Sequence, residues 1–364
     1  MHRPNREHPA AGPRVARSIV QYNFTPPVTA CRFRLALALY FRYDGSMQPQ
    51  RGELSSFSMN KQVPVTLFDI KRFALHDGPG IRTSVFFKGC SLTCAWCHNP
   101  ESQSTEPQLM HNANLCVNCE ACLPACSHGA IRHGSAVPVT DRSLCTACGA
   151  CAAACPYEAR QVSGYTSPVA EVMDVLTLDR PFYKESGGGV TLSGGEPLHQ
   201  PDAVLALLET CKRQGMHTAL DTCGYVPKTI IKQVAPLVDL FLYDLKLMDN
   251  QDHLHATGVP NQEILENLRV LDHLGARIWL RLPLIPGVND APDQLEAVAD
   301  FASNLNHLEA LHLLPYHRSG VGKAKQLGRC PAFDATPRLH DDLATFPNAI
   351  GSRIDVPVLL GGNA

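Results

Sequence analysis

The sequence has little net charge and no long apolar run. Its 32 Lys and Arg against 34 Asp and Glu give a formal net charge of −2, which removes the electrostatic argument for a nucleic-acid binder. The longest apolar stretch, 35–41, is far too short to span a bilayer. We therefore expect neither a nucleic acid nor a membrane as a partner of this 364-residue chain.

Residues 1–58 lack lysine and any hydrophobic periodicity. They contain eight Arg, six Pro and only three acidic residues. We expect residues 1–62 to be a disordered extension, or the result of a start codon placed ahead of Met59. An Arg-rich, acid-poor segment also fits some transit peptides, but no small-residue cleavage pattern follows its apolar run.

Cysteine is the residue type in excess. Eleven of the 15 cysteines lie in three clusters between Cys90 and Cys155. Disulfide scaffolds are short and secreted, whereas this chain is long and shows no credible signal peptide. The clusters therefore predict metal ligands in a reducing cytoplasm.

From residue 63, short β-rich runs alternate with amphipathic helical segments such as 201–213, 262–273 and 293–302. The six predicted strands are 84–87, 190–192, 218–220, 240–243, 278–282 and 311–314. This alternation predicts an α/β fold with a parallel sheet of right-handed βαβ units. We expect residues 63–103 and 161–330 to form a partial (β/α)6 barrel, with 331–364 packing on it or trailing from it. Residues 104–160 lack the rhythm and are expected to be an inserted domain.

The first cysteine cluster, Cys90-x3-Cys94-x2-Cys97, closely follows a predicted strand. A structural zinc site would want a fourth ligand, and His98 is poorly placed because adjacent side chains rarely face one metal. A cubane iron–sulfur cluster on three cysteines leaves one iron open for a substrate, as a catalytic zinc keeps an open position.

The other eight clustered cysteines repeat the bacterial ferredoxin pattern C-x2-C-x2-C-x3-C. In two-cluster ferredoxins the fourth Cys of each run ligates the other cluster, so the insert is expected to be a ferredoxin-like domain with two [4Fe–4S] clusters. The predicted ligand sets are Cys116, Cys119, Cys122 and Cys155 for one cluster, and Cys145, Cys148, Cys151 and Cys126 for the other. A pair of zinc ribbons is the alternative, although ribbons usually pair two C-x2-C arms across a longer gap.

Distinctive residues also stand at the carboxyl ends of the predicted strands: Gly194, Gly195, Glu196, Asp221, Thr222, Asp244, Lys246, Arg281 and His317. Each has a structural explanation on its own, such as an ion pair between Asp244 and Lys246. Because the carboxyl ends of barrel strands form the active-site face, their combination predicts a catalytic site.

Taken together, these motifs resemble the radical S-adenosylmethionine (SAM) superfamily, whose signature is the C-x3-C-x2-C loop with an aromatic residue, here Trp96, before the last Cys. The stretch Asp77-Gly-Pro-Gly-Ile-Arg82 narrows the resemblance to the activating proteins of glycyl radical enzymes. The ferredoxin-like insert narrows the resemblance further, to the subgroup of these activating proteins that carries two additional iron–sulfur clusters. The similarity covers roughly residues 65–330.

The resemblance implies roles for these residues. Cys90, Cys94 and Cys97 would hold the catalytic cluster, with Trp96 near the adenine of SAM. Gly194, Gly195 and Glu196 would bind the methionyl amine. Asp244, Lys246, Arg281 and His317 would contact the nucleoside and the methionyl carboxylate. Asp221 and Thr222 match a monovalent-cation site, to which Leu242 could add a carbonyl. Asp77, Gly78, Pro79, Gly80 and Arg82 would face the glycyl loop of the partner.

The resemblance also implies an oxidoreductase that cleaves SAM reductively and abstracts hydrogen from a backbone glycine of a partner glycyl radical enzyme. Its cofactors would be three [4Fe–4S] clusters, SAM and a monovalent cation, and its electron donor a flavodoxin or a ferredoxin. Two alternatives stay open: a radical SAM enzyme with a small-molecule substrate, and an iron–sulfur electron-transfer protein.

Overall fold

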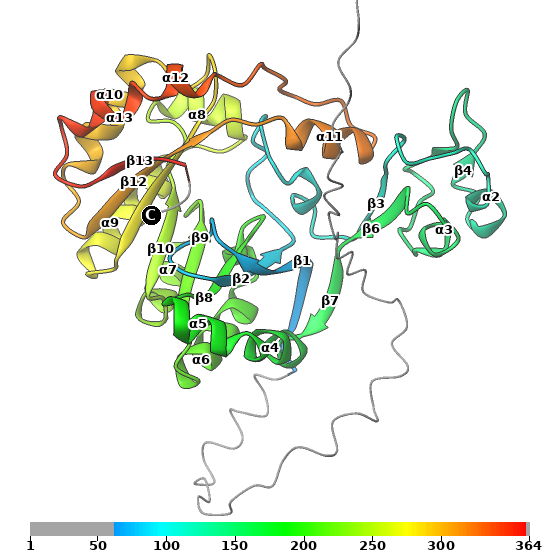
Figure 1. Ribbon diagram of the computed structural model, residues 1–364, viewed down its shortest axis with the longest axis horizontal. Coiled ribbons are helices and arrows are strands. Elements are labelled where there is room, and N and C mark those ends of the chain that lie inside the picture. The colour runs from blue at the N-terminus through cyan, green and yellow to red at the C-terminus, as the bar shows by residue number, and fades with distance from the viewer. Residues whose placement is uncertain (1–61, 362–364) are drawn as a thin grey trace, which may run out of the picture. The chain divides into compact units, whose positions relative to one another are not determined.

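A computed structural model gives the fold of residues 62–361 (Figure 1). The extension expected at 1–62 lies outside these residues except for Gln62. The centre of the fold is a nine-stranded mixed sheet in the order β13-β12-β11-β10-β9-β8-β2-β1-β7. In the part of the chain that the structure describes, β13 and β7 are the two edges, so the sheet is open, as a partial barrel requires.

All six predicted strands are present and run parallel. They are β2 (Arg82–Phe87), β8 (Gly189–Gly194), β9 (His217–Thr222), β10 (Leu240–Asp244), β11 (Ile278–Leu284) and β12 (Leu308–Pro315). Most of their residues are buried, as is typical of parallel strands covered on both faces.

The prediction of a purely parallel, six-stranded sheet is wrong in extent, because three strands were missed. β1 (Pro64–Ala74) and β7 (Tyr165–Pro168) are antiparallel additions at one edge, and β13 (Val358–Leu360) pairs with β12 at the other. β1 mixes buried with exposed positions and carries charged residues such as Asp69 and Lys71, so it lacks a continuous apolar run. The other two strands are only four and three residues long.

Helices connect the parallel strands, and the three expected helical segments are present as α6, α9 and α10. The main helices are α4 (Val169–Leu178), α5 (Arg180–Ser186), α6 (Pro201–Arg213), α7 (Lys228–Val234), α8 (Asn250–Thr257), α9 (Gln262–His273), α10 (Pro292–Ala302) and α11 (Ser319–Gln326). Proline occupies the first helical position of α6 and α10, where a missing N–H costs nothing. Asp249 caps α8 by accepting hydrogen bonds from the backbone N–H groups of Gln251 and Asp252.

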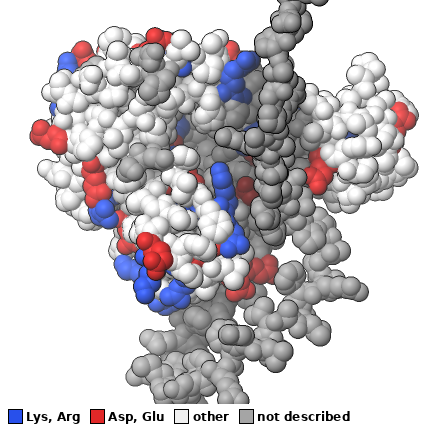
Figure 2. All heavy atoms as spheres, viewed as in Figure 1, with Lys and Arg blue, Asp and Glu red and all other residues white. Residues whose placement is uncertain are grey.

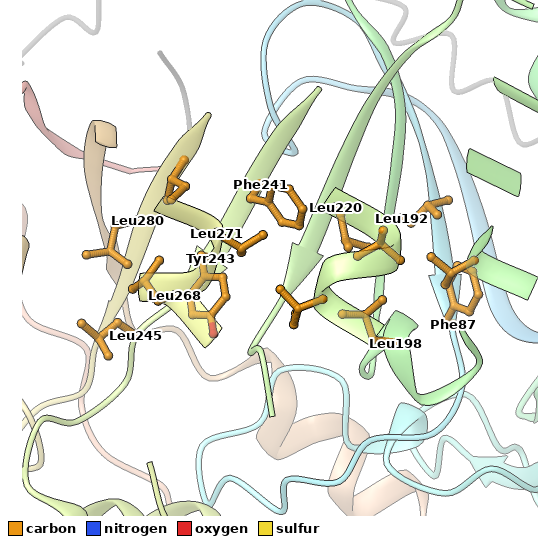
Figure 3. Packing of buried hydrophobic residues seen from close by; sticks show 14 of the residues in the cluster. Phe87, Leu192, Leu198, Leu220, Phe241, Tyr243, Leu245, Leu268, Leu271 and Leu280 are labelled. Carbon is orange, nitrogen blue, oxygen red and sulfur yellow. The ribbon is translucent and has the colours of Figure 1, made fainter. Parts of the chain in front are cut away.

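The two faces of the sheet differ in character. On the face covered by helices, strand residues such as Leu220 and Phe241 belong to one large apolar core with Leu268 and Leu271 of α9 (Figure 3). On the inner face, a smaller apolar cluster consists of Ala219, Leu240, Leu242, Trp279 and Ala310. Side chains on one face recur every second residue, so Asp221, Asp244 and Arg281 continue this inner face toward the carboxyl ends. The inner face therefore changes from apolar to polar along the strands.

The segment expected as an insert contains two small antiparallel pairs, β3 (Gln108–His111) with β6 (Arg160–Ser163), and β4 (Ile131–Arg132) with β5 (Val139–Thr140). Two four-residue helices, α2 (Cys122–Ala125) and α3 (Ala150–Ala153), complete it. Its buried apolar cluster has four members, Leu109, Cys122, Ile131 and Cys151, of which two are cysteines. So small a core leaves much of the insert's stability to other interactions.

Both ends of the insert meet at Lys88, which is fully buried at the carboxyl end of β2. Its Nζ donates hydrogen bonds to the carbonyl oxygens of Glu101 (2.6 Å) and Ser104 (3.1 Å), where the chain leaves the sheet. Where the chain returns, a Cβ at Gly164 would lie 2.4 Å from the Lys88 Cε, so only glycine fits against this side chain.

The C-terminal segment contains α12 (His340–Leu343) and α13 (Phe346–Gly351) before β13. Leu343, Ile350 and Ile354 join the large core. On the face drawn in Figure 2, acidic and basic side chains are interspersed. Between residues 62 and 361, the structure has no helix that is both long and apolar enough to cross a bilayer.

The core predicts a large stability effect at Leu207, a fully buried residue of α6. Leu207→Ala should lower the free energy of unfolding by about 2 to 5 kcal/mol, because it removes apolar contacts and leaves a cavity. Leu178→Ala, at a site that is 65% exposed, should change it by less than about 0.5 kcal/mol. Denaturant titration of both variants would contradict this packing if the two losses were equal.

Candidate active site

A hollow of about 910 Å³, open space at its mouth included, lies at the carboxyl ends of the parallel strands. We call it the central hollow. Eleven predicted site residues border it: Cys90, Cys94, Trp96, Cys97, Gly194, Gly195, Asp221, Thr222, Asp244, Lys246 and Arg281. The structure thus brings together motifs that are up to 191 positions apart in the sequence.

The cysteine loop between β2 and the 3-10 helix η1 (Pro100–Ser102) is fastened to the end of α8. The backbone N–H groups of Thr93 and Ala95 donate to the carbonyl oxygens of Thr257 (2.8 Å) and Ala256 (3.0 Å). Burial raises the pKa of the Cys90 and Cys94 thiols to about 12 and also raises that of Cys97. Thiolate ligation at this loop must therefore release protons.

The three thiols border a space and do not converge. Over residues 62–361, no three His, Cys, Asp or Glu side chains meet as the ligands of a single metal ion would. A cubane takes each thiolate on a separate iron, so it needs thiols arranged around a volume. The donor set of this loop fits such a cluster.

Four charged side chains form a chain of ion pairs across β9, β10 and β11. The Arg281 guanidinium donates from Nη2 to Asp221 Oδ1 (2.6 Å) and from Nε to Asp244 Oδ1 (2.9 Å). The Lys246 Nζ donates to Asp244 Oδ2 (2.9 Å). Burial acts to raise the pKa of Asp244, but Arg281 and Lys246 outweigh it and lower that pKa to about 2. Two carboxylates and two cations leave this ion-pair chain with no net charge.

The glycine turn after β8 packs directly on the cysteine loop. The backbone N–H groups of Gly195 and Glu196 donate to the carbonyl oxygens of Phe87 (2.9 Å) and Gly89 (2.8 Å). A Cβ at Gly195 would lie 2.4 Å from the Gly89 oxygen, so the two loops approach this closely only with glycine. With these N–H groups used, the polar groups that the turn can offer a ligand are carbonyl oxygens, which accept hydrogen bonds.

Glu196 and His317 do not border the central hollow. The Glu196 carboxylate is fully buried and accepts hydrogen bonds from Thr222 Oγ1 (2.8 Å) and from the backbone N–H of Cys223 (2.8 Å). It therefore ties the turn after β8 to the end of β9. His317 stacks on His98 with ring centroids 3.7 Å apart, and it is His98 that faces the hollow.

The structure does not bring the side chains of the predicted cation pair together. Asp221 accepts hydrogen bonds from Arg281 and from Ser193 Oγ (2.6 Å), whereas Thr222 donates to Glu196. Consecutive strand residues face opposite sides of a sheet, which separates the two side chains although both residues border the hollow.

The loop expected to face a glycyl loop is held from inside by Arg82. This guanidinium is fully buried and donates to Thr191 Oγ1 (2.6 Å), the Val190 oxygen (2.6 Å) and the Pro79 oxygen (3.1 Å). Asp77 accepts from Ser84 Oγ (2.5 Å) and acts electrostatically on Arg281. Asp77 thus faces the barrel interior, while the Arg82 side chain fastens the loop to β8.

Several residues that border the hollow were not among the predicted site residues: His98, Asn99, Ser102, Ser193, Cys223, Pro283 and Leu314. Most of them adjoin or lie two positions from a predicted site residue. The two-residue period of a strand could have identified Pro283, which shares the inner face with Arg281.

The insert contains two further hollows, each bordered by four cysteines. Cys116, Cys119, Cys122 and Cys155 border the first insert hollow, of about 310 Å³. Cys126, Cys145, Cys148 and Cys151 border the second insert hollow, of about 320 Å³. These are the two groups that the ferredoxin spacing predicts, including the exchange of the fourth cysteine between runs.

The ion-pair chain predicts that Asp244→Asn lowers the free energy of unfolding by about 3 kcal/mol, because the buried cations Arg281 and Lys246 lose a carboxylate that both of them contact. Glu309→Gln, which breaks the exposed pair with Arg277, should cost at most about 1 kcal/mol. The pKa of Asp244 is lowered, so its stabilisation is complete above the unfolded-state pKa and is lost as pH falls through about 2. The variants are compared at pH 7, because burial raises the pKa of Asp221 in the same ion-pair chain to about 6, and this carboxyl therefore titrates between pH 5 and pH 7. Chemical denaturation at pH 7 would contradict the pairing if Asp244→Asn and Glu309→Gln cost the same.

Comparison with known proteins agrees with this geometry. Residues 84–302 match the family model of the Radical SAM superfamily. The choline trimethylamine-lyase activating enzyme of Oleidesulfovibrio alaskensis is 43% identical over 302 residues, covering 80% of this chain and 96% of that protein. The trans-4-hydroxy-L-proline dehydratase activating enzyme of Clostridioides difficile is 47% identical over 260 residues, covering 71% and 86%. The isethionate sulfite-lyase activating enzyme of Desulfovibrio desulfuricans is 45% identical over 304 residues, covering 80% and 96%. The chain belongs to the radical SAM superfamily and, within it, to the activating enzymes of glycyl radical enzymes.

Proposed function

We propose that this protein cleaves SAM reductively and uses the 5′-deoxyadenosyl radical to remove a hydrogen atom from a backbone glycine of a partner enzyme. The observation that carries the proposal is the central hollow, where three half-buried thiols border the same space as the ion-pair chain and the glycine turn.

Membership of the superfamily implies one [4Fe–4S] cluster and SAM as cofactors. The donor set of Cys90, Cys94 and Cys97 fits the cluster. When bound, the cluster supplies one electron at low potential and an open iron for the amine and carboxylate of SAM.

The residues around the hollow then bind and orient SAM. The Lys246 ammonium has three N–H donors and spends one on Asp244, so the others can reach the methionyl carboxylate. The carbonyl oxygens of the glycine turn can accept from the methionyl ammonium. Trp96 is 6% exposed and offers an apolar ring for the adenine. Because the ion-pair chain has no net charge, it repels neither the ammonium nor the carboxylate of the methionyl group.

We further propose that the insert is a ferredoxin-like domain with two [4Fe–4S] clusters, one in each insert hollow. The grouping of the eight thiols supports this assignment. The clusters would pass electrons from a flavodoxin or a ferredoxin. Clusters bound by thiolates persist where thiols stay reduced, which supports a cytoplasmic location.

The partner would be a glycyl radical enzyme whose glycyl loop enters the barrel. The position of Asp77, facing the barrel interior near Arg281, supports a contact with that loop. Three relatives of 43 to 47% identity carry the names of three different partner enzymes, so overall similarity does not select the partner. A monovalent cation would bind at Asp221, where Leu242, its partner on the neighbouring strand, could add a carbonyl ligand.

The decisive test is Cys94→Ala in protein loaded with iron under anaerobic conditions. Wild type should bind about twelve irons and form 5′-deoxyadenosine, whereas the variant should bind about eight and form none. Cys330→Ala, which removes an exposed thiol outside the three clusters, should behave as wild type. Full iron loading of wild type without SAM cleavage under strong reduction would refute the proposed reaction.

Iron removal gives a second prediction, because the insert has so small a core. Chelation should abolish the hydrogen-exchange protection of residues 108–163 and leave the parallel strands protected, since metal binding contributes folding energy. An insert that stays protected without iron would contradict the assignment of structural clusters to its hollows.

A further inference from the structure

Three arginines between the insert and the cysteine loop have no carboxylate partner within residues 62–361. Arg160, Arg142 and Arg329 donate instead to carbonyl, hydroxyl and amide oxygens. The most costly is Arg160, which is 2% exposed and donates to Thr140 Oγ1 and the Pro138 oxygen, both at 2.7 Å. A buried charge without a counter-charge is unfavourable, so an anion bound beside Arg160 would stabilise it.

Arg160 lies between the two insert hollows. It borders the first insert hollow together with Cys116 and Cys155. It also donates to Thr140 Oγ1, and Ile131, the partner of Thr140 in the β4–β5 pair, borders the second insert hollow. One guanidinium is therefore within electrostatic reach of both groups of cysteines.

Arg142 links the second insert hollow to α11. It is solvent-exposed and donates to the carbonyl oxygen of Leu109, a residue that borders this hollow, and to that of Gln326 (3.0 Å) at the end of α11. Cys145 and Cys151 both act electrostatically on its guanidinium.

Arg329 continues the line to the cysteine loop. Its Nη1 donates to Gln103 Oε1 (3.0 Å) and to the Pro100 oxygen (3.3 Å), directly after the C-x3-C-x2-C loop. It borders a side hollow of about 560 Å³ that also contains Cys94 and Cys97. The Arg142 guanidinium lies beside Gly328, the residue before Arg329, since a Cβ at Gly328 would lie 3.3 Å from the Arg142 Nε.

We propose that these arginines are the counter-charges of the three iron–sulfur sites and that they set the order of electron transfer. The inference rests on the proposed function, because it needs the two insert clusters. Arg160 serves both insert clusters, Arg142 the second, and Arg329 the catalytic cluster. The electron then passes from the first insert hollow to the second, and from there to the cysteine loop.

The charges account for this arrangement. A [4Fe–4S] cluster with four thiolates is anionic, and each reduction adds one negative charge. A fixed cation nearby stabilises the reduced form and raises the reduction potential. In each passage, an external one-electron donor of the flavin or iron–sulfur class is oxidised, each insert cluster is reduced and reoxidised in turn, and the catalytic cluster keeps the electron. No proton or bond changes place.

The test is a redox titration of the iron-loaded full-length protein, followed by electron paramagnetic resonance, for four arginine-to-methionine variants. Arg160→Met should lower the potentials of both insert clusters, Arg142→Met that of the second only, and Arg329→Met that of the catalytic cluster only. In each case we expect the ratio of reduced to oxidised cluster at a fixed potential to fall about tenfold. Arg132→Met is the matched control for Arg142, since Arg132 is exposed and already paired with Asp141 (3.0 Å), and it should shift nothing.

Arg160→Lys keeps the charge if Arg160→Met fails to fold, and it should keep both potentials near wild type. The iron count is measured first: about four irons in wild type would refute the insert clusters and this inference with them. About twelve irons, with potentials that do not follow the predicted pattern across the three variants, would refute the arginine assignment and leave the proposed function intact.

Discussion

The chain of ion pairs from Asp221 through Arg281 and Asp244 to Lys246 is the constraint on which the carboxyl face of the sheet depends. It joins the ends of three neighbouring parallel strands, and all four groups are largely removed from water. Buried charges are tolerated only with close partners, so these strands must end in register for the sheet to be stable. The register that stabilises the sheet is thus also the one that shapes the central hollow.

The six parallel strands could be predicted because burial on both faces leaves continuous apolar runs in the sequence. β1 could not be found in this way, since it mixes buried and exposed residues and lacks a continuous apolar run. The grouping of the insert cysteines followed from spacing, because three of four ligands in each set are local and the crossing of the fourth follows a known pattern.

The orientation of individual side chains was beyond the sequence. Asp221 and Thr222 are adjacent in one motif, yet the pleat of β9 directs one to Arg281 and the other to Glu196. Glu196 likewise belongs to the glycine motif, but its carboxylate is directed to Thr222 and the Cys223 backbone and not into the hollow. His317 follows the end of β12, where no strand period fixes its direction, and stacks behind His98.

The central hollow and the insert balance charge in opposite ways. The hollow pairs its own cations and carboxylates, so it is electrostatically complete before a ligand arrives. Arg160 in the insert has only hydroxyl and carbonyl oxygens as hydrogen-bond partners within the described residues, so an anion beside it would complete its charge balance. With the proposed clusters in the insert hollows, folding of the insert and loading of its hollows would be linked more tightly than folding and ligand binding in the barrel.

Lys88 has a consequence for how such a protein can evolve. One buried ammonium group closes the sheet where the insert leaves it, and Gly164 packs against the same side chain where the insert returns. The points where the chain leaves and re-enters the sheet thus form a single junction. Beside this junction, β2 and β8 pair directly through their own backbone hydrogen bonds. A cassette of another length could replace residues 105–163 at this junction without altering the order of the strands, so gain or loss of the insert requires no redesign of the barrel.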